Sequence, residues 1–490
     1  MIERRSFLKT MGFGFAGGLA GCILPSRYSW ADELKPANST KPNILIIVTD
    51  DQGYADMSAF SHHAPDIQTP NMDRISQDGI LFSQGYVTAP VCSPSRAGWN
   101  TGCYQQRWGH LNWGAKLPPG RKTLAEHLRR AGYATGKVGK SDFGVGYHSH
   151  DSREYPLNHG FDEFLGFSSH AHDYFLLSEE IAKRTPDPHG HSAALGPLMH
   201  NRSWKEYKEG YTTEIFTDEA IEFLKMQQGQ PFFLNVSFNS LHHLIHEVPE
   251  KYLRKHGCDP IPNYDPSMGK YEDYYREYAV PDPVDEKWSK LYLANLECLD
   301  DNIGRILDAL DELRLSENTL VIFFSDNGGS PYTGASNKPL SGSKYNLREG
   351  GIRVPLSMRF PGRFNPGVTY PHIVSSLDIV PTCLAAAGIE TQEDRLDGLN
   401  LLNKMSGTEL IPVRSTPLFW RWKKQFAVRH GDWKLLKLDD AKTCLYNLNN
   451  DVAEQHDLSA RHPEKLKDLL DAYNSWQLEM EASTNQHREQ

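Results

Sequence analysis

The sequence predicts an α/β fold: a mainly parallel central sheet covered by helices on both faces, followed by a small C-terminal antiparallel-sheet subdomain. Two patterns lead to this prediction. Up to about residue 400, uninterrupted apolar runs, typical of strands buried on both faces, alternate with amphipathic helical segments. Beyond it, apolar and polar residues alternate, as expected for antiparallel strands. The length of 490 residues allows two or three domains.

The central sheet is predicted from apolar runs that end in polar residues. Between these runs, Thr123 can cap a helix that Gly132 ends, and leucine and isoleucine side chains line one side of a long helix across residues 296–310. Strands that alternate with helices predict parallel pairing. The strands are expected within residues 42–53, 133–144, 231–243 and 319–329.

The C-terminal pattern predicts a small sheet with one face in water. Apolar and polar residues alternate across 417–438 and 443–448, with a Gly-Asp turn at 431–432. A helix-like tail, from Pro463 to about Met480, is expected to cover the other face.

The N-terminus resembles an export signal. Arg4 and Arg5 precede a weakly apolar, glycine-rich stretch too short to span a bilayer, a pattern typical of twin-arginine transport out of a bacterial cytoplasm. Residues 19–22 resemble a lipobox, in which Cys22 would be acylated, and this interpretation is favoured over ordinary cleavage near Ala31. The protein is therefore expected to be exported, and to be either periplasmic or lipid-anchored at the cell envelope.

The chain is expected to contain one large and one small domain. Residues 263–288, rich in Tyr, Asp, Glu and Pro, are interpreted as a surface insertion, as a solvated loop in preference to a lid. The predicted boundaries are 1–31 for the signal peptide, 32–41 for a polar linker, 42–400 for the large domain and 401–490 for the C-terminal α+β subdomain.

Charge and cysteine usage exclude several classes of protein. The net charge of -10 argues against nucleic-acid partners, and a membrane is expected to be contacted only through the possible N-terminal anchor. The seven cysteines are scattered without zinc-like or CxxC spacing, which does not indicate a disulfide framework. Cys92, in the stretch "VCSPSRAGWNTG", stands beside Pro94 and Arg96. It is open to three interpretations: a disulfide partner, a reactive thiolate and a chemically converted cysteine.

Polar side chains follow the predicted strands at the point where each strand ends. In open parallel sheets, ligands bind outside the carboxyl ends of the strands. Each of these residues alone is explained by turn formation or by a solvated surface, but together they would form one cluster. They are Asp50, Asp51, Lys140, His242, Asp326 and Asn327.

The chemistry of this cluster indicates a metal-assisted reaction on an anion. Three carboxylates and an amide oxygen form an all-oxygen ligand set, which fits Ca²⁺ best and Mg²⁺ second. A divalent metal with lysine and arginine around it can hold a tetrahedral oxyanion and stabilise charge that builds on it. The substrate is therefore expected to be a sulfate or phosphate ester, with Cys92 near the metal as the precursor of the nucleophile. The expected cations are Arg96, Lys140, Lys344 and Lys338.

Several ordered motifs resemble the type I sulfatase family over nearly the whole chain beyond the export signal. "CSPSRAGWNTG" is similar to the family signature, in which the cysteine is oxidised by a dedicated maturation enzyme to Cα-formylglycine. "PNILIIVTDDQGYAD", "HGFDEFLGF", "FFSDNGG", "LREGGIRVP" and "GDWKLL" also resemble family segments. The resemblance implies an alkaline-phosphatase-like fold with a small C-terminal subdomain, which agrees with the prediction from the strand pattern. It makes residues 42–400 the catalytic domain.

The resemblance also implies a role for each polar residue. Arg96 would stabilise the hydrated aldehyde, and Lys140, His242 and Lys344 would contact the sulfate. His242 is the implied proton donor to the leaving alcohol. One hydroxyl of the gem-diol would attack sulfur to form a covalent sulfate hemiester, and the second would then lose its proton as sulfate is expelled. The implied calcium ligands are Asp50, Asp51, Asp326, Asn327 and the formylglycine derived from Cys92.

The chain departs from the family pattern at one catalytic position. Asp142, in "GKSDFG", stands where the family usually has a histidine that contacts the formylglycine hydroxyls. Asp142 can replace that histidine as the base of the elimination step, and this interpretation is favoured. The change can also mean a slow or inactive enzyme, or a neighbour such as His148 or His150 can fill the space.

The expected function is that of a sulfuric ester hydrolase which releases inorganic sulfate from a sulfated carbohydrate. The alternatives are a phosphomonoester, phosphodiester or phosphonate hydrolase of the same superfamily, and a catalytically impaired homologue that only binds sulfated glycans. Aromatic and cationic residues in loop-like contexts are candidates for a sugar pocket, although each also fits a packing or surface role. They are Trp113, His170, His172, Tyr174, Lys338 and Arg421.

Overall fold

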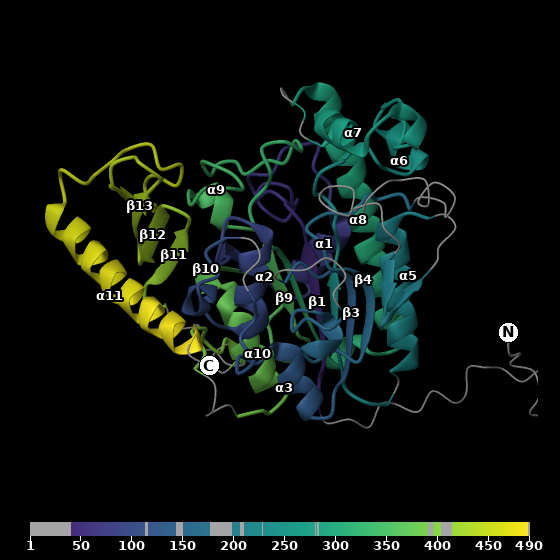
Figure 1. The fold of residues 1–490 in the computed structure, drawn as a ribbon, viewed down its shortest axis with the longest axis horizontal. Helices are drawn as coiled ribbons and strands as arrows, with labels where there is room; N and C mark the ends of the chain where they lie inside the picture. Colours follow the sequence, from purple (N-terminus) through teal and green to yellow (C-terminus); the bar gives the residue numbers. More distant parts are fainter. Residues whose placement is uncertain are drawn as a thin grey trace, which may run out of the picture. The chain divides into compact units, whose positions relative to one another are not determined.

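Ten strands form the central sheet of this computed structural model, and most of them run parallel (Figure 1). Their order is β10-β2-β9-β8-β1-β7-β3-β4-β5-β6. The predicted fold class is thereby confirmed. The structure describes residues 41–112, 116–143, 150–176, 198–205, 210–227, 229–279, 281, 284–390, 395–402 and 414–488. The predicted signal peptide, lipobox and most of the linker therefore lie outside the described residues.

The middle of the sheet consists of the four strands that the sequence predicts. β1 (Asn43–Thr49) pairs in parallel with β7 (Phe232–Ser237) on one side and with β8 (Thr319–Ser325) on the other. β3 (Ala134–Lys140) follows β7, also in parallel. Every residue of β1, β7 and β8 is buried, because helices cover both faces of the sheet.

The outer strands make the sheet mixed. β9 lies antiparallel between β2 and β8, β4 continues the parallel pairing beside β3, and two short antiparallel strands close that side. The bounds are β2 Ile80–Tyr86, β4 Glu163–Phe167, β5 Leu198–His200, β6 Ser203–Lys205, β9 Leu356–Arg359 and β10 Val368–Ser375.

Alternate side chains of β1 enter two different cores. Leu45 and Ile47 pack with α1 (Pro70–Gln77), α5 (Thr212–Met226) and α8 (Glu286–Glu312), whereas Ile44, Ile46 and Val48 pack with α3 (Leu124–Arg130) and α10 (Ile379–Ala386). The strand period of two residues thus places one set of apolar side chains on each face of the sheet. No helix in the described part of the chain is both long and apolar enough to cross a membrane.

Four antiparallel strands form a second sheet, which α11 (Pro463–Arg488) covers on one face (Figure 1). The other face is not in water, so the prediction of a wet face is wrong. Lys434, on that face, is fully buried, and its Nζ lies 2.9 Å from both Glu349 and Glu454. The face packs against residues that follow β2 and precede α9 (Glu349–Ile352). The strands are β11 Leu418–Trp422, β12 Gln425–His430, β13 Trp433–Lys437 and β14 Cys444–Asn447.

Part of the tyrosine-rich insertion at 263–288 is a helix and not a solvated loop. α7 (Tyr271–Tyr278) buries Tyr271, Tyr274 and Tyr275, which lie at helical spacing on one side. The hydroxyl of Tyr274 donates to Glu247 Oε1 at 3.1 Å, and α6 (Glu250–Lys255) lies nearby along the chain (Figure 1). The polar composition misled the prediction because three of the tyrosines are buried despite their polar hydroxyl groups.

Candidate active site

The carboxyl ends of three parallel strands meet at one edge of the central sheet. β1 leads into Asp50 and Asp51, β8 into Asp326 and Asn327, and β3 ends on Lys140. All five side chains are fully buried. Because these strands are parallel neighbours, the residues that follow them lie together although up to 277 positions separate them along the chain (Asn327 minus Asp50).

Three carboxylates face one another in this cluster. Asp50, Asp51 and Asp326 each offer an oxygen, and these oxygens all lie within 4.8 Å of one another. Burial raises the pKa of Asp51, and burial together with the Asp50 carboxylate raises the pKa of Asp326 to about 7. Negative charge held this closely is stabilised by cations.

The oxygen atoms of the cluster fit a hard divalent cation. The amide of Asn327 donates to Asp51 Oδ1 at 2.6 Å, which turns its own Oδ1 away as a free acceptor. Asn327 Oδ1 and Asp50 Oδ1 are both buried without a hydrogen-bond partner among the described residues. Such orphaned oxygens are costly unless they bind something, and carboxylate and amide oxygens are the ligands that Ca²⁺ prefers.

Each of the three carboxylates also has a buried cation beside it. Lys140 Nζ lies 2.6 Å from Asp50 Oδ2, and Lys344 Nζ lies 2.8 Å from Asp51 Oδ2. Arg96 Nη2 lies 2.8 Å from Asp326 Oδ2. These three carboxylates and three cations balance, and Asp142, whose Oδ2 lies 3.3 Å from Lys140 Nζ, adds one more negative charge, so a divalent metal still leaves the cluster positive. The cluster is then complementary to an anion.

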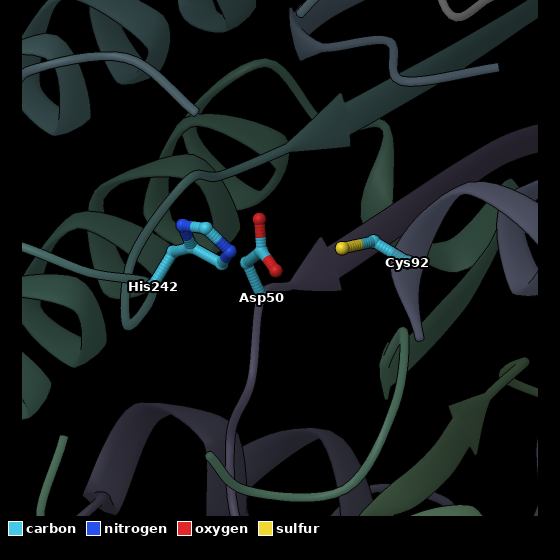
Figure 2. Close-up of side chains that lie close together, drawn as sticks. All are labelled: Asp50, Cys92 and His242. Atoms are coloured by element: carbon cyan, nitrogen blue, oxygen red, sulfur yellow. The ribbon is translucent and has the colours of Figure 1, made fainter. Parts of the chain in front are cut away.

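Cys92 begins helix α2 (Cys92–Thr101), and its side chain points into the cluster. Figure 2 shows its sulfur directed toward Asp50, with His242 beyond the carboxylate, and ligand atoms of the three lie within 4.8 Å of one another. Arg96 follows one helical turn later on the same side. The start of α2 thus supplies both a side chain near the carboxylates and one of their cations.

The surroundings of Cys92 disfavour two of its three interpretations. The thiol is free, as are the other described cysteines, so it forms no disulfide with any of them. Burial raises the pKa of the Cys92 thiol well above its ordinary range, although Lys140 and Lys344 lower it. Burial therefore disfavours a thiolate at this position, and the third interpretation, a chemically converted cysteine, stays a prediction.

His242 lies at the edge of the cluster. Its Nε2 is 3.8 Å from Asp51 Oδ2, and burial, helped by the charge of Lys344, lowers its pKa well below the ordinary value. Its ring stacks on His243 with centroids 4.1 Å apart, and His243 Nδ1 lies 2.5 Å from the hydroxyl of Tyr275 on α7. The sequence pattern did not predict this contact, although the tyrosine spacing within 271–278 is a helical pattern that could have indicated it.

Asp142 is buried two residues beyond β3 and lies against His170. Its Oδ1 is 2.5 Å from His170 Nδ1, and its Oδ2 is 3.3 Å from Lys140 Nζ. Burial alone would raise the pKa of Asp142, but His170 and then Lys140 hold it well below its ordinary range. Of the two histidines expected as substitutes, His148 lies outside the described residues, and the His150 ring packs on Tyr155.

The other candidates for a sugar pocket lie in varied surroundings. Trp113 is outside the described residues, and Lys338 is exposed. His172 and Tyr174 are buried. His172 Nδ1 lies 2.8 Å from a backbone carbonyl oxygen, and the hydroxyl of Tyr174 donates to another carbonyl at 2.9 Å. Arg421, on β11, lies 3.4 Å from a glutamate of α11. Their part in a sugar pocket stays a prediction.

Comparison with known proteins gives consistent matches over most of the chain. Residues 42–389 match the family described as "Sulfatase", and residues 343–480 match "N-sulphoglucosamine sulphohydrolase, C-terminal". The N-acetylgalactosamine-6-sulfatase of Canis lupus familiaris is 32% identical over 420 residues, which cover 80% of this chain and 71% of that protein. The Homo sapiens protein of the same name is 31% identical over 404 residues, 77% of this chain and 68% of its own.

Solved structures extend this likeness to the fold. Ps i-CgsB, solved in complex with k-i-k-neocarrahexaose, is 29% identical to this chain, with a TM-score of 0.76. The superposition covers 90% of this chain and 93% of that chain. The likeness therefore includes both sheets and not only the strands around the cluster.

Proposed function

We propose, since the chain belongs to the sulfatase family, that this enzyme releases inorganic sulfate from a sulfated carbohydrate. The observation that carries the proposal is the cluster around Cys92, in which three buried carboxylates are each paired with a buried cation. Such a site, once it holds a divalent metal, attracts a tetrahedral anion and stabilises charge that develops on it.

The proposed site needs two groups that the unmodified chain does not supply, a converted residue 92 and a metal ion. A hydrated formylglycine at residue 92 supplies the nucleophilic oxygen, and Ca²⁺ supplies positive charge beside the sulfate group. A formylglycine-generating enzyme is the partner that would convert Cys92. The orphaned oxygens of Asp50 and Asn327 support the metal. The residues that would hold Ca²⁺ are Asp50, Asp51, Asp326, Asn327 and residue 92.

The side chains around this centre are proposed to bind the sulfate group, orient residue 92 and donate a proton. Lys140 and Lys344 would move from their carboxylates to the sulfate oxygens once the metal has neutralised Asp50 and Asp51. Arg96, buried at the start of α2, orients residue 92 and shares the developing charge. His242 is the proposed proton donor to the leaving alcohol, once the negative charge of a bound sulfate group offsets the burial and the Lys344 charge that lower its pKa.

Carbohydrate is the proposed substrate class because similar proteins are named for sugars. The curated relatives are called N-acetylgalactosamine-6-sulfatase, and Ps i-CgsB was solved with a neocarrahexaose. The proposed location is outside the cytoplasm, periplasmic or lipid-anchored, and Arg4, Arg5 and Cys22 support it.

Parallel hydrolysis assays test the proposed activity. The chain is co-expressed with a formylglycine-generating enzyme, its mass is measured intact, and it is assayed with aryl sulfate, aryl phosphate, aryl phosphonate and sulfated oligosaccharides. We expect conversion of Cys92 and release of sulfate, with Cys92→Ala as the inactive control. Faster release of phosphate or phosphonate would replace the proposal with the corresponding hydrolase. If the protein with converted Cys92 binds sulfated sugars without hydrolysing them, the protein is a binding protein and not a hydrolase.

A further inference from the structure

A buried carboxylate and a half-exposed imidazole form a pair beside the cluster. Asp142 Oδ1 lies 2.5 Å from His170 Nδ1, with the Asp142 side chain fully buried and 40% of the His170 side chain exposed. Asp142 also has a φ of 43°, in the left-handed region that residues other than glycine adopt at a cost. The fold thus maintains an unfavourable backbone conformation at the residue that holds this histidine.

Two neighbouring strands bring the pair together. β3 and β4 run parallel, with Lys140 in register with Phe167, and the backbone N–H of Ser141 donates to the carbonyl of Phe167 at 2.9 Å. Asp142 and His170 therefore leave the same edge of the sheet a few residues beyond paired positions. The pair results from the sheet topology and not from a flexible surface contact.

The contact determines which nitrogen of His170 can accept a proton. Nδ1 carries the hydrogen that it donates to the carboxylate, so Nε2 is left with its lone pair. No described residue offers Nε2 a hydrogen-bond partner. A buried carboxylate that fixes the tautomer of a partly exposed imidazole is the usual arrangement of a general base.

The pair adjoins the proposed reaction centre. Asp142 Oδ2 lies 3.3 Å from Lys140 Nζ, and that ammonium group contacts Asp50, which lies beside Cys92. Asp142 itself is a poor base, because His170 and Lys140 keep its carboxyl group ionised at low pH.

We propose that His170, held by Asp142, accepts the proton that must leave residue 92 when sulfate is released from it. This inference rests on the proposed function. In that step the side-chain carbon of residue 92 carries the sulfate group and one remaining hydroxyl group. The O–H bond of that hydroxyl breaks, and its electron pair forms the C=O bond of the aldehyde. The bond from the same carbon to the sulfate oxygen breaks, its electron pair leaves with sulfate, and the proton moves to His170 Nε2. Asp142 is the positioning residue and His170 the catalytic base.

Rapid-mixing kinetics test the assignment of the step. His170→Gln and Asp142→Asn are compared with His430→Gln, a control on the second sheet, using an aryl sulfate and intact mass spectrometry of quenched samples. We expect His170→Gln to release one equivalent of phenol and then to turn over about 10²–10⁴-fold more slowly, with protein heavier by one sulfate group accumulating. Added imidazole should partly restore turnover of His170→Gly. Unchanged turnover, or loss of the first phenol equivalent without accumulated sulfated protein, overturns the proposal.

A spectroscopic measurement tests the pair without any turnover. A low-field proton NMR signal from His170 Nδ1–H is expected in the wild-type protein and should be lost in both His170→Gln and Asp142→Asn. Absence of that signal from the wild-type protein overturns the pair even if the enzyme is active. Wild-type protein that releases no sulfate refutes the proposed function instead, and the NMR signal still decides whether Asp142 holds His170.

Discussion

Replacing Lys344 with methionine separates the contribution of this buried cation from that of the metal. Lys344 Nζ lies 2.8 Å from Asp51 Oδ2, and both side chains are buried. At an effective dielectric constant of about 20, two unit charges at that separation attract by about 6 kcal/mol, part of which offsets desolvation. Removing one partner of a buried ion pair costs about 3–5 kcal/mol, because the other charge stays buried.

The stability lost in Lys344→Met should depend on whether calcium is bound. In a chelator, Lys344→Met is expected to lower the free energy of unfolding by about 3–5 kcal/mol, since Asp51 Oδ1 keeps the amide of Asn327 but Oδ2 loses its cation. With saturating Ca²⁺, the charge of the metal balances the Asp51 carboxylate, so Lys344→Met should lower the free energy of unfolding by clearly less. Urea unfolding followed by tryptophan fluorescence, with and without Ca²⁺, measures both values.

The matched control is Lys424→Met. Lys424 Nζ lies 3.3 Å from Asp440, but their side chains are 72% and 87% exposed, so little change in unfolding is expected. If Lys344→Met were as stable as the wild-type protein in chelator, the carboxylate would not depend on this lysine. If its loss were the same with Ca²⁺ as without, the carboxylate cluster would not be the calcium site.

Three further predictions concern the nucleophile, the metal and the pH dependence. Cys92→Ala should retain the fold and lose sulfatase turnover by at least about 10³-fold, as circular dichroism and phenol release will show. Calcium at about 100 times its dissociation constant should raise the free energy of unfolding by about 2.7 kcal/mol over chelator, whereas Asp326→Ala should abolish that gain. Burial raises the pKa of Asp56 from 3.8 to about 7, so the folded chain binds this proton more tightly than the unfolded chain. Stability should therefore fall as pH rises from about 4 to about 7, and Asp56→Asn should flatten that slope in urea titrations.

The strand ends around the cluster could be predicted because they depend on local pattern and one topological rule. Apolar runs identified β1, β7 and β8, and parallel pairing placed their carboxyl ends together. The same argument correctly brought Asp50, Asp51 and Asp326 into one place. This prediction does not need the exact packing of side chains, since the register of buried parallel strands is strongly specified and fixes where the strands end.

Predictions from composition were wrong where tertiary packing buries residues of types that are usually exposed. Residues 271–278 look solvated, yet three of the tyrosines are buried and Tyr275 reaches His243. Lys434 alternates with apolar neighbours as an exposed lysine would, yet it lies between two buried glutamates. In both cases the partner comes from a distant segment, so the local pattern carried no sign of it.

The sequence by itself determined the α/β fold class, the carboxylate and amide oxygens at the strand ends and the unusual context of Cys92, because these depend on residue types at fixed local positions. Only the tertiary structure decided which cation faces which carboxylate and which histidine accompanies Asp142. His170 lies 28 residues further along the chain, and the two meet because β3 and β4 are parallel neighbours. The physical reason is that side-chain pairing at 2.5–3.3 Å depends on how separate strands pack, which residue order alone does not specify.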